Sequence, residues 1–119
     1  GREFEYGRGD GYGFTKNSPL LPGQGDEDWK RLVERDLFPA FEGFKPEFIL
    51  VSAGFDAHRD DDMSDIQLST ECYSWIMQQL VGMANTYTGG RIISVLEGGY
   101  SLRRLPELAR NHMEILLNG

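Results

Sequence analysis

Two short runs of aliphatic residues constrain the fold of this chain more than any other feature. The first run covers residues 48–51, the second covers residues 91–96, and each is followed within a few positions by glycine. Uninterrupted apolar runs of this length, rich in β-branched residues, are typical of strands that are buried on both faces of a parallel sheet. The two runs therefore predict an α/β fold built on a mainly parallel sheet.

Three segments with apolar residues spaced three and four positions apart predict helices between and after these strands. They cover residues 26–43, residues 69–89 and a stretch from about 102 or 106 to 117, and Ser69 is expected to cap the second helix. A further short strand is expected near residues 14–17, within a glycine-rich segment. Strands that alternate with helices predict right-handed crossovers and a three-layer α-β-α arrangement, with the whole chain forming a single domain.

Charge and cysteine content exclude several classes of protein. Twelve Lys and Arg residues against nineteen Asp and Glu residues give a net charge of −7, which opposes binding to nucleic acid and to anionic membranes. No apolar run approaches the roughly 18 residues that a membrane-spanning helix needs. Cys72 is the only cysteine, so an internal disulfide and a cysteine-based zinc cluster are excluded, and the expected location is the reducing cytoplasm.

Polar and aromatic residues follow both predicted strands at the point where each strand ends. Asp56 and His58 follow the first strand, and Gly98, Gly99 and Tyr100 follow the second. Because sites in open parallel sheets collect beyond the carboxyl ends of the strands, Asp56 and Tyr100 are expected to face one crevice. A carboxylate can bind zinc and a phenol can donate to an oxyanion. Taken singly, however, such an Asp more often forms a turn and such a Tyr more often packs, so both interpretations stay open.

Four further aspartates lie in the loop after the first strand, at positions 60, 61, 62 and 65. Several carboxylates together can bind calcium. Their spacing does not fit a calcium-binding loop of the EF-hand type, because the central glycine and the late glutamate are missing. We therefore expect a solvated acidic loop.

Two segments together carry a resemblance to a known family. The segments ILVSAGFDAHRDDD, from Ile49 to Asp62, and RIISVLEGGYSL, from Arg91 to Leu102, resemble the two C-terminal signature segments of the histone deacetylase and acetylpolyamine amidohydrolase superfamily, particularly its bacterial, class II-like members. The opening segment GRGDGYGFTKNSPLLPGQGD resembles a glycine-rich stretch of the same family. The resemblance covers nearly the whole chain and implies a partial arginase/deacetylase-like fold.

The resemblance implies roles for four residues at the strand ends. Asp56 matches one of the zinc ligands of the family, and Tyr100 matches the phenol that stabilises the oxyanion during amide hydrolysis. Gly98 and Gly99 match positions that line the pocket and place the tyrosine. By this resemblance Tyr100 is the catalytic residue, Asp56 is a metal ligand, and zinc is the cofactor of the complete enzyme.

The resemblance also indicates what this chain lacks. The family needs a further Asp-x-His zinc pair and two tandem histidines, whereas only His58 and His112 are present here. His58 does not match a zinc ligand, so we expect it to contact a ligand residue without binding the metal, or to stabilise the loop. His112 is expected to be a partly buried helical residue. The backbone near Phe14 matches a monovalent-cation site of related enzymes, which potassium would occupy.

Two functions are therefore considered. By resemblance, residues 1–119 are the C-terminal portion of a zinc-dependent deacylase that hydrolyses N-acetyl or other N-acyl amides of lysine or polyamine. Gly1 matches the last glycine of a Pro-Gly-Thr-Gly turn of the family, so the N-terminal half is expected to be absent and the isolated chain inactive. The alternative is a non-catalytic α/β interaction module that self-associates through an exposed sheet edge. The expected partners are an acetylated amine or lysine together with the missing half, or another copy of the chain.

Overall fold

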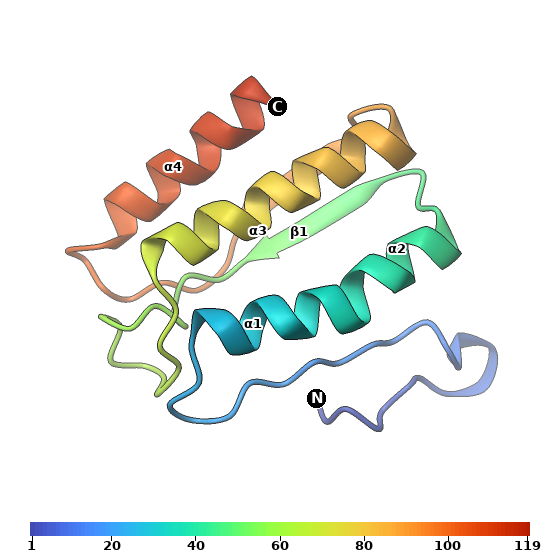
Figure 1. Ribbon diagram of the computed structural model, residues 1–119, viewed down its shortest axis with the longest axis horizontal. Coiled ribbons are helices and arrows are strands. Elements are labelled where there is room, and N and C mark those ends of the chain that lie inside the picture. Colours follow the sequence, from blue (N-terminus) through green and yellow to red (C-terminus); the bar gives the residue numbers. More distant parts are fainter.

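The computed structural model describes residues 1–119 and contains a sheet of two parallel strands with helices packed beside it. Strand β1 (Ile49–Ala53) pairs with β2 (Ile92–Leu96), and the register runs from Ile49 opposite Ile92 to Ala53 opposite Leu96. Figure 1 shows β1 among the helices. The helices that connect and follow the strands lie alongside them. This arrangement confirms the predicted α/β class and the prediction that the two apolar runs are neighbouring parallel strands.

Helices form in all three of the segments that the apolar spacing indicates. The helical elements are η1 (Gly9–Gly11), α1 (Asp26–Leu32), η2 (Val33–Leu37), α2 (Phe38–Phe44), α3 (Thr70–Met83), η3 (Ala84–Thr88) and α4 (Leu105–Asn118). Elements α1, η2 and α2 follow one another without a break and form one helical rod, as α3 and η3 do. None of these helices combines the length and the hydropathy that crossing a membrane would require.

The middle of the first rod is a π turn that the apolar spacing does not predict. Element η2 ends at Leu37, and Pro39 follows as the second residue of α2. In a regular helix the proline ring would clash with the carbonyl of Arg35 and would leave that carbonyl without a donor. The wider π turn accommodates the proline, so the rod continues where a single α-helix would kink.

The prediction of a short strand near residues 14–17 is wrong. These residues have no regular secondary structure, and the sheet has two strands. Gly13, just before the segment, has a φ of +90°, a conformation that does not continue a strand. The Phe14 side chain is exposed and contacts the Phe44 ring edge-on, at 6.2 Å between centroids, instead of packing on the sheet.

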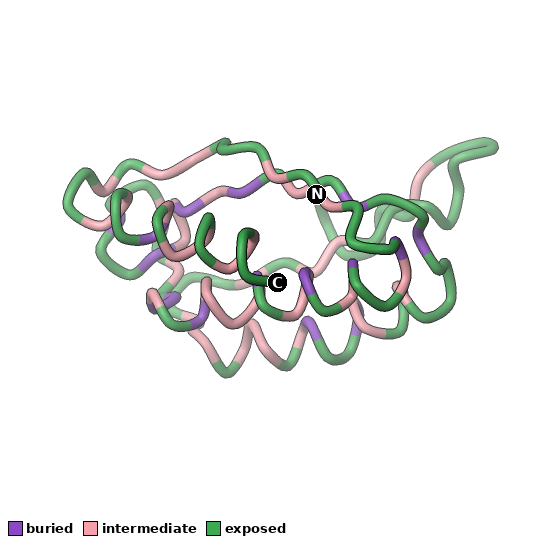
Figure 2. Tube along the Cα trace, turned by 90° about the horizontal axis from the view of Figure 1, so that it is seen from above, coloured by how far each residue is buried: buried purple, intermediate pink, exposed green.

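The prediction that both faces of the strands are buried is also wrong for this chain. Burial alternates along β1, where Ile49 and Ala53 are buried but Leu50 is 75% exposed. The ladder pairs Leu50 with Ile93 and Ser52 with Val95, so these side chains share one face of the sheet, and all four are exposed. Figure 2 shows the buried residues as short, scattered segments of the chain. One face of the sheet therefore carries apolar side chains that nothing in this chain covers.

The core lies on the other face of the sheet, between β1, α3 and α4. It is centred on Ala53, Phe55 and Leu108, against which Val51, Tyr73 and Leu105 pack. Helices α3 and α4 run beside each other above β1 (Figure 1). This small core ties the segment after β1 to both of the helices.

The start of α3 is fixed by a cap and by a contact with α1. The Ser69 hydroxyl accepts the Cys72 N–H at 3.1 Å, which confirms the predicted cap. The Ser69 N–H and hydroxyl both donate to the carboxylate of Asp26, the first residue of α1. The amino termini of the two helices are thus linked through one carboxylate.

The small core predicts that stability depends strongly on Leu108. Leu108 is 2% exposed and Leu117, on the same helix, is 84% exposed. We expect Leu108→Ala to lower the free energy of unfolding by about 2–5 kcal/mol, because it removes buried methyl groups and leaves a cavity. The matched control Leu117→Ala should change it by less than about 0.5 kcal/mol. Equal effects of the two substitutions in urea unfolding would contradict a core centred on Leu108.

Candidate functional site

The loops that follow β1 and β2 are joined by backbone hydrogen bonds beyond the strands. The Glu97 N–H donates to the Ala53 carbonyl at 3.0 Å, and the Phe55 N–H donates to the Gly98 carbonyl at 2.9 Å. These bonds continue the parallel pairing into the two loops. As a result, Asp56 follows one strand and Tyr100 follows the other at the same end of the sheet, as the sequence predicts.

The Asp56 carboxylate lies directly against the Gly98 backbone. A methyl group at Gly98 would lie 2.8 Å from Oδ1 and 3.0 Å from Cγ of Asp56, and one at Gly54 would lie 3.0 Å from the same Oδ1. Only glycines leave the carboxylate this space. Asp56 accepts no hydrogen bond and forms no ion pair with another side chain, so both carboxylate oxygens are free to bind a ligand.

Tyr100 is carried by a turn that requires glycine. Gly99 has a φ of +144°, and a methyl group on it would lie 2.9 Å from Leu105 Cδ1 and 3.3 Å from Phe55 Cβ. The Tyr100 side chain is 58% exposed and its hydroxyl has no partner in the chain. The position of the phenol therefore depends on how the backbone of the turn is held.

The expectation of a solvated acidic loop is wrong for Asp61, although Asp62 and Asp65 are exposed as expected. Asp61 is 4% exposed, and its Oδ2 accepts the N–H of Tyr100 at 2.7 Å and that of Ser101 at 3.1 Å. Its Oδ1 accepts the Met63 N–H at 2.9 Å. Burial acts to raise the pKa of Asp61, but these three backbone donors outweigh burial and lower it, so the carboxylate is charged at neutral pH.

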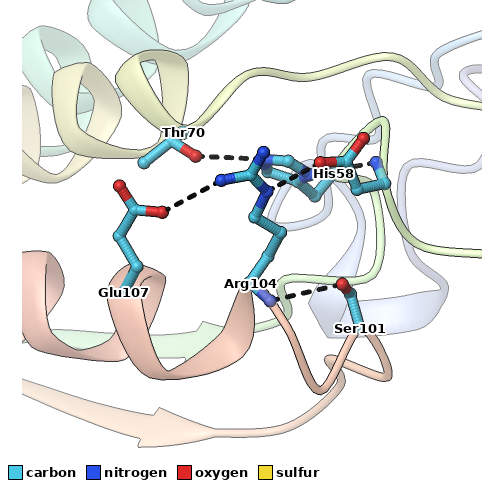
Figure 3. A network of polar contacts seen from close by, with 6 residues as sticks. His58, Thr70, Ser101, Arg104 and Glu107 are labelled. Carbon is cyan, nitrogen blue, oxygen red and sulfur yellow. Dashed lines mark hydrogen bonds and ion pairs between the residues drawn. The ribbon is translucent and has the colours of Figure 1, made fainter.

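A second contact joins the same two loops through side chains. The Arg104 Nε–H donates to Asp60 Oδ2 at 2.7 Å, and Arg104 Nη1 lies 3.4 Å from Glu107 Oε2 (Figure 3). The Arg104 N–H donates to the Ser101 hydroxyl at 3.3 Å. This network is more exposed than the contacts of Asp61. It holds the second loop at Arg104, just before α4 begins.

His58 is a structural residue of the loop and not a free ligand. Its Nδ1 accepts the Asp60 N–H at 3.0 Å, so the ring proton lies on Nε2, which donates to Thr70 Oγ1 at 3.0 Å (Figure 3). The ring is buried and stacks on Tyr73 with 6.5 Å between centroids. Both nitrogens are engaged, so His58 cannot form a chelating pair with Asp56 in this arrangement.

Tyr73 has a role at the site that the sequence does not indicate. Its hydroxyl accepts the N–H of Ala57, the residue after Asp56, at 3.1 Å. Its ring packs on Phe55 at 5.2 Å between centroids. The helical spacing predicts Tyr73 only as an apolar member of α3, and nothing in the sequence marks its hydroxyl as a partner of the loop.

The structure does not bring Phe14 together with the residues at the strand ends. Phe14 and Phe44 line a surface hollow with Pro46, which precedes β1, whereas Asp56 follows the other end of that strand. The monovalent-cation role of the Phe14 backbone stays a prediction.

Two other residues with reactive side chains are engaged in packing. The His112 Nε2 lies 2.7 Å from the Ser94 hydroxyl, its ring packs edge-on against Phe55, and burial lowers its pKa. This agrees with the expectation of a partly buried helical residue. Burial raises the pKa of the Cys72 thiol to about 12, so at neutral pH the thiol is not a nucleophile.

The residues of this chain could supply one metal ligand but not a whole metal site. No group of three or more His, Cys, Asp or Glu side chains is placed to hold a metal ion. Zinc sites use three or four protein ligands, with carboxylate oxygen among the accepted donors. Asp56, free of other partners, fits one ligand position. His58 and His112 do not fit the others, because each ring is already bonded within the chain.

The fold and the site define an α/β domain with a free carboxylate and an exposed phenol at the ends of two parallel strands. Residues 1–116 match the histone deacetylase domain family, and the chain belongs to this family. The match confirms the superfamily that the two strand-end segments resemble.

The relatives are considerably longer than this chain. It is 42% identical over 98 residues to a probable deacetylase of Archaeoglobus fulgidus, a match that covers 82% of this chain and 27% of the relative. It is 40% identical over 112 residues to human polyamine deacetylase HDAC10, covering 93% of this chain and 16% of the relative. Among solved structures, the HD domain of HDA15 has a TM-score of 0.88 at 33% identity, over 99% of this chain and 32% of that chain.

Because His58 is buried, we expect the free energy of unfolding to fall in mild acid. Burial lowers the pKa of His58 below the unfolded value of about 6.5, so the unfolded chain binds protons first as the pH falls. Its contribution to stability is therefore present above about pH 6.5 and is lost as the pH falls toward the folded pKa. We expect the free energy of unfolding in urea to be lower at about pH 5.5 than at about pH 7.5.

His112 shifts in the same direction, so the two histidines must be separated by substitution. The pH dependence should become shallower in His58→Gln and in His112→Gln, and nearly flat across this range when both are replaced. A double variant that keeps the full pH dependence would show that other groups cause it.

Proposed function

We propose that this chain forms part of a zinc-dependent deacylase that hydrolyses N-acetyl, or other N-acyl, amides of lysine or polyamine. Membership in the histone deacetylase domain family supports the reaction class. The observation that carries the proposal is the placement of a free carboxylate, Asp56, and an exposed phenol, Tyr100, beyond the ends of two hydrogen-bonded parallel strands. In open parallel sheets this is where sites form.

Asp56 is proposed as one oxygen ligand of the metal. When bound, zinc supplies Lewis-acid activation of water and of the amide carbonyl. Asp56 suits the ligand role because its carboxylate has no competing protein partner and Gly98 leaves room beside it. The remaining ligands and the general base must come from residues outside this chain, since both of its histidines are engaged. We therefore expect the 119 residues alone to bind zinc weakly and to be inactive.

Tyr100 is proposed as the hydrogen-bond donor to the oxyanion. In amide hydrolysis water adds to the carbonyl carbon, the carbonyl oxygen becomes negatively charged, and the C–N bond then breaks to release a carboxylate and an amine. A phenol held near that oxygen stabilises the charge as it develops, an interaction that is stronger in the transition state than in the substrate complex. The exposed hydroxyl of Tyr100, which has no partner in the chain, is available for this role.

The substrate classes follow from the relatives and from charge. One relative is described as a polyamine deacetylase, and a structural neighbour with a TM-score of 0.82 is an acetylpolyamine aminohydrolase of Burkholderia pseudomallei. Other relatives are described as histone deacetylases. A net charge of −7 favours the approach of cationic substrates, and both polyamines and lysine-rich peptides are cationic.

The phenol role predicts the effect of Tyr100→Phe in a complete deacetylase domain that contains these residues. We expect kcat for an acetyl-lysine amide or an acetylpolyamine to fall by about 10²–10³, because one oxyanion donor is lost. The zinc content should not change. Tyr87→Phe is the matched control, since Tyr87 lies on η3 against Phe41, and it should keep full activity. Full activity of Tyr100→Phe would refute the proposed role.

The ligand role of Asp56 is tested by metal content, independently of turnover. In the complete domain Asp56→Ala should lose most of the bound zinc, measured by elemental analysis after dialysis. The 119-residue chain should acquire stoichiometric zinc and release acetate only when it is mixed with the missing part of the domain. Stoichiometric zinc in Asp56→Ala would exclude this residue as a ligand.

The exposed sheet face favours a second candidate function, a non-catalytic module that self-associates. Leu50, Ile93 and Val95 present a contiguous apolar face, and both edges of the two-stranded sheet are unpaired. Such surfaces favour association between copies. In this case the chain would form dimers or larger assemblies and would bind no metal.

Self-association through this face predicts that a charge at its centre restores the monomer. We expect the chain to sediment as a dimer or larger species in analytical ultracentrifugation, and Leu50→Lys to shift it to the monomer. Met63→Lys, at an exposed apolar residue in the acidic loop, is the matched control and should leave the assembly unchanged. A monomeric wild-type chain would exclude this second function.

A further inference from the structure

We propose that Asp61 is a positioning residue that holds the backbone of Tyr100 and so fixes the direction in which its phenol leaves the turn. The inference rests on the proposed function, because it assigns the means by which the oxyanion donor is held. Asp61 does not touch the reacting atoms and acts only through the turn that carries Tyr100.

The contacts of Asp61 are directed at one point of the turn. A single oxygen, Oδ2, accepts the N–H groups of two consecutive residues, Tyr100 at 2.7 Å and Ser101 at 3.1 Å. The other oxygen accepts the Met63 N–H at 2.9 Å, which fixes the carboxylate in its own loop. Hydrogen bonds to an ionised acceptor are about twice as strong as neutral ones. Asp61 therefore anchors the second loop to the first at the backbone N–H of Tyr100.

The phenol depends on this anchor because no other group in the chain binds the Tyr100 N–H or its hydroxyl. The Tyr100 side chain is exposed and its hydroxyl has no partner, so its direction is set by the backbone. On the preceding side, Gly99 adopts a φ of +144° and, without a side chain, offers little resistance to rotation. Removing the bonds to Asp61 would release the N–H groups of Tyr100 and Ser101 while leaving the phenol itself and the bonds that Ser101 accepts from Arg104 and Leu105 intact.

A neutral amide cannot replace the carboxylate at this position. An asparagine has one oxygen and one NH₂ group, whereas the three donors around Asp61 need two accepting oxygens. If the amide oxygen faces Tyr100 and Ser101, the NH₂ group opposes the Met63 N–H, and the reverse orientation opposes the other two donors. Asp61→Asn therefore keeps the size of the side chain and removes the charge-assisted contact.

The neighbouring carboxylate provides a matched control. Asp60 also joins the two loops, but it binds the Arg104 guanidinium and does not contact the Tyr100 backbone. Its contact is partly exposed, where ion pairs contribute little. Asp60→Asn therefore makes the same chemical change one residue away without releasing the turn.

The first test uses hydrogen exchange in the 119-residue chain. In Asp61→Asn the amides of Tyr100 and Ser101 should exchange at least about tenfold faster than in the wild type at the same pH. The amides of β1 and β2 should keep their protection. Asp60→Asn should leave Tyr100 and Ser101 unchanged. Unchanged protection of these two amides in Asp61→Asn would overturn the anchoring role.

The second test is a double-mutant cycle in the complete domain, with rates normalised to bound zinc so that only folded sites are counted. Asp61→Asn should lower kcat by about 10- to 100-fold, as expected for a misplaced catalytic group, with KM within about twofold of the wild type. In the Tyr100→Phe background the same substitution should lower kcat by less than about twofold, because the group it positions is already gone. Asp60→Asn should have little effect in either background.

The outcomes separate this inference from the proposed function. Full activity of Tyr100→Phe would refute the oxyanion role that the proposed function gives Tyr100, whatever Asp61→Asn does. A large loss in Tyr100→Phe, together with an Asp61→Asn loss that stays undiminished in the Phe background, would overturn the positioning role alone. A loss in Asp61→Asn that appears as a change in KM or in zinc content would overturn it as well.

Discussion

The parallel pairing of β1 with β2, continued past the strands by backbone hydrogen bonds, is the interaction on which the site depends. It fixes the register from Ile49 and Ile92 onward and then joins Phe55 to Gly98 in the loops. Because the paired strands end at opposite positions of the ladder, the residues that follow them lie next to each other at the same end of the sheet. A slip of one position would turn Phe55 away from Leu108 and separate Asp56 from the Gly98 backbone.

Close approach and buried charge together shape the loops beyond the strands. Gly98 makes room for the Asp56 carboxylate, and Gly99 allows the turn to pass close to Phe55. Asp61 is buried there as an anion, which is unfavourable unless several donors compensate, and three backbone N–H groups do so. Two carboxylates five residues apart thus have opposite environments, because one is saturated with donors and the other has none.

The sequence predicted the strands, the three helical segments and the end of the sheet where Asp56 and Tyr100 lie, because apolar periodicity and glycine positions are local signals. It did not predict which aspartate is buried, since Asp61 and its neighbours look alike along the chain and differ only in what the second loop brings to them. The strand predicted near residues 14–17 is absent for a similar reason, because a strand needs the edge of another strand to pair with and that is not a local signal. The uncovered sheet face shows that an apolar run predicts a strand more reliably than it predicts what covers that strand.

The contacts of Asp61 also have a consequence for the order of folding. The donors it binds lie 39 and 40 residues further along the chain, nearly as far as Ile92 lies from its strand partner Ile49. Closing a loop of this length costs chain entropy, and the contacts that offset this cost form only once the loop has closed. The segment that carries Tyr100 should therefore become ordered together with the strand pairing, and should be exposed to proteases when the strands separate.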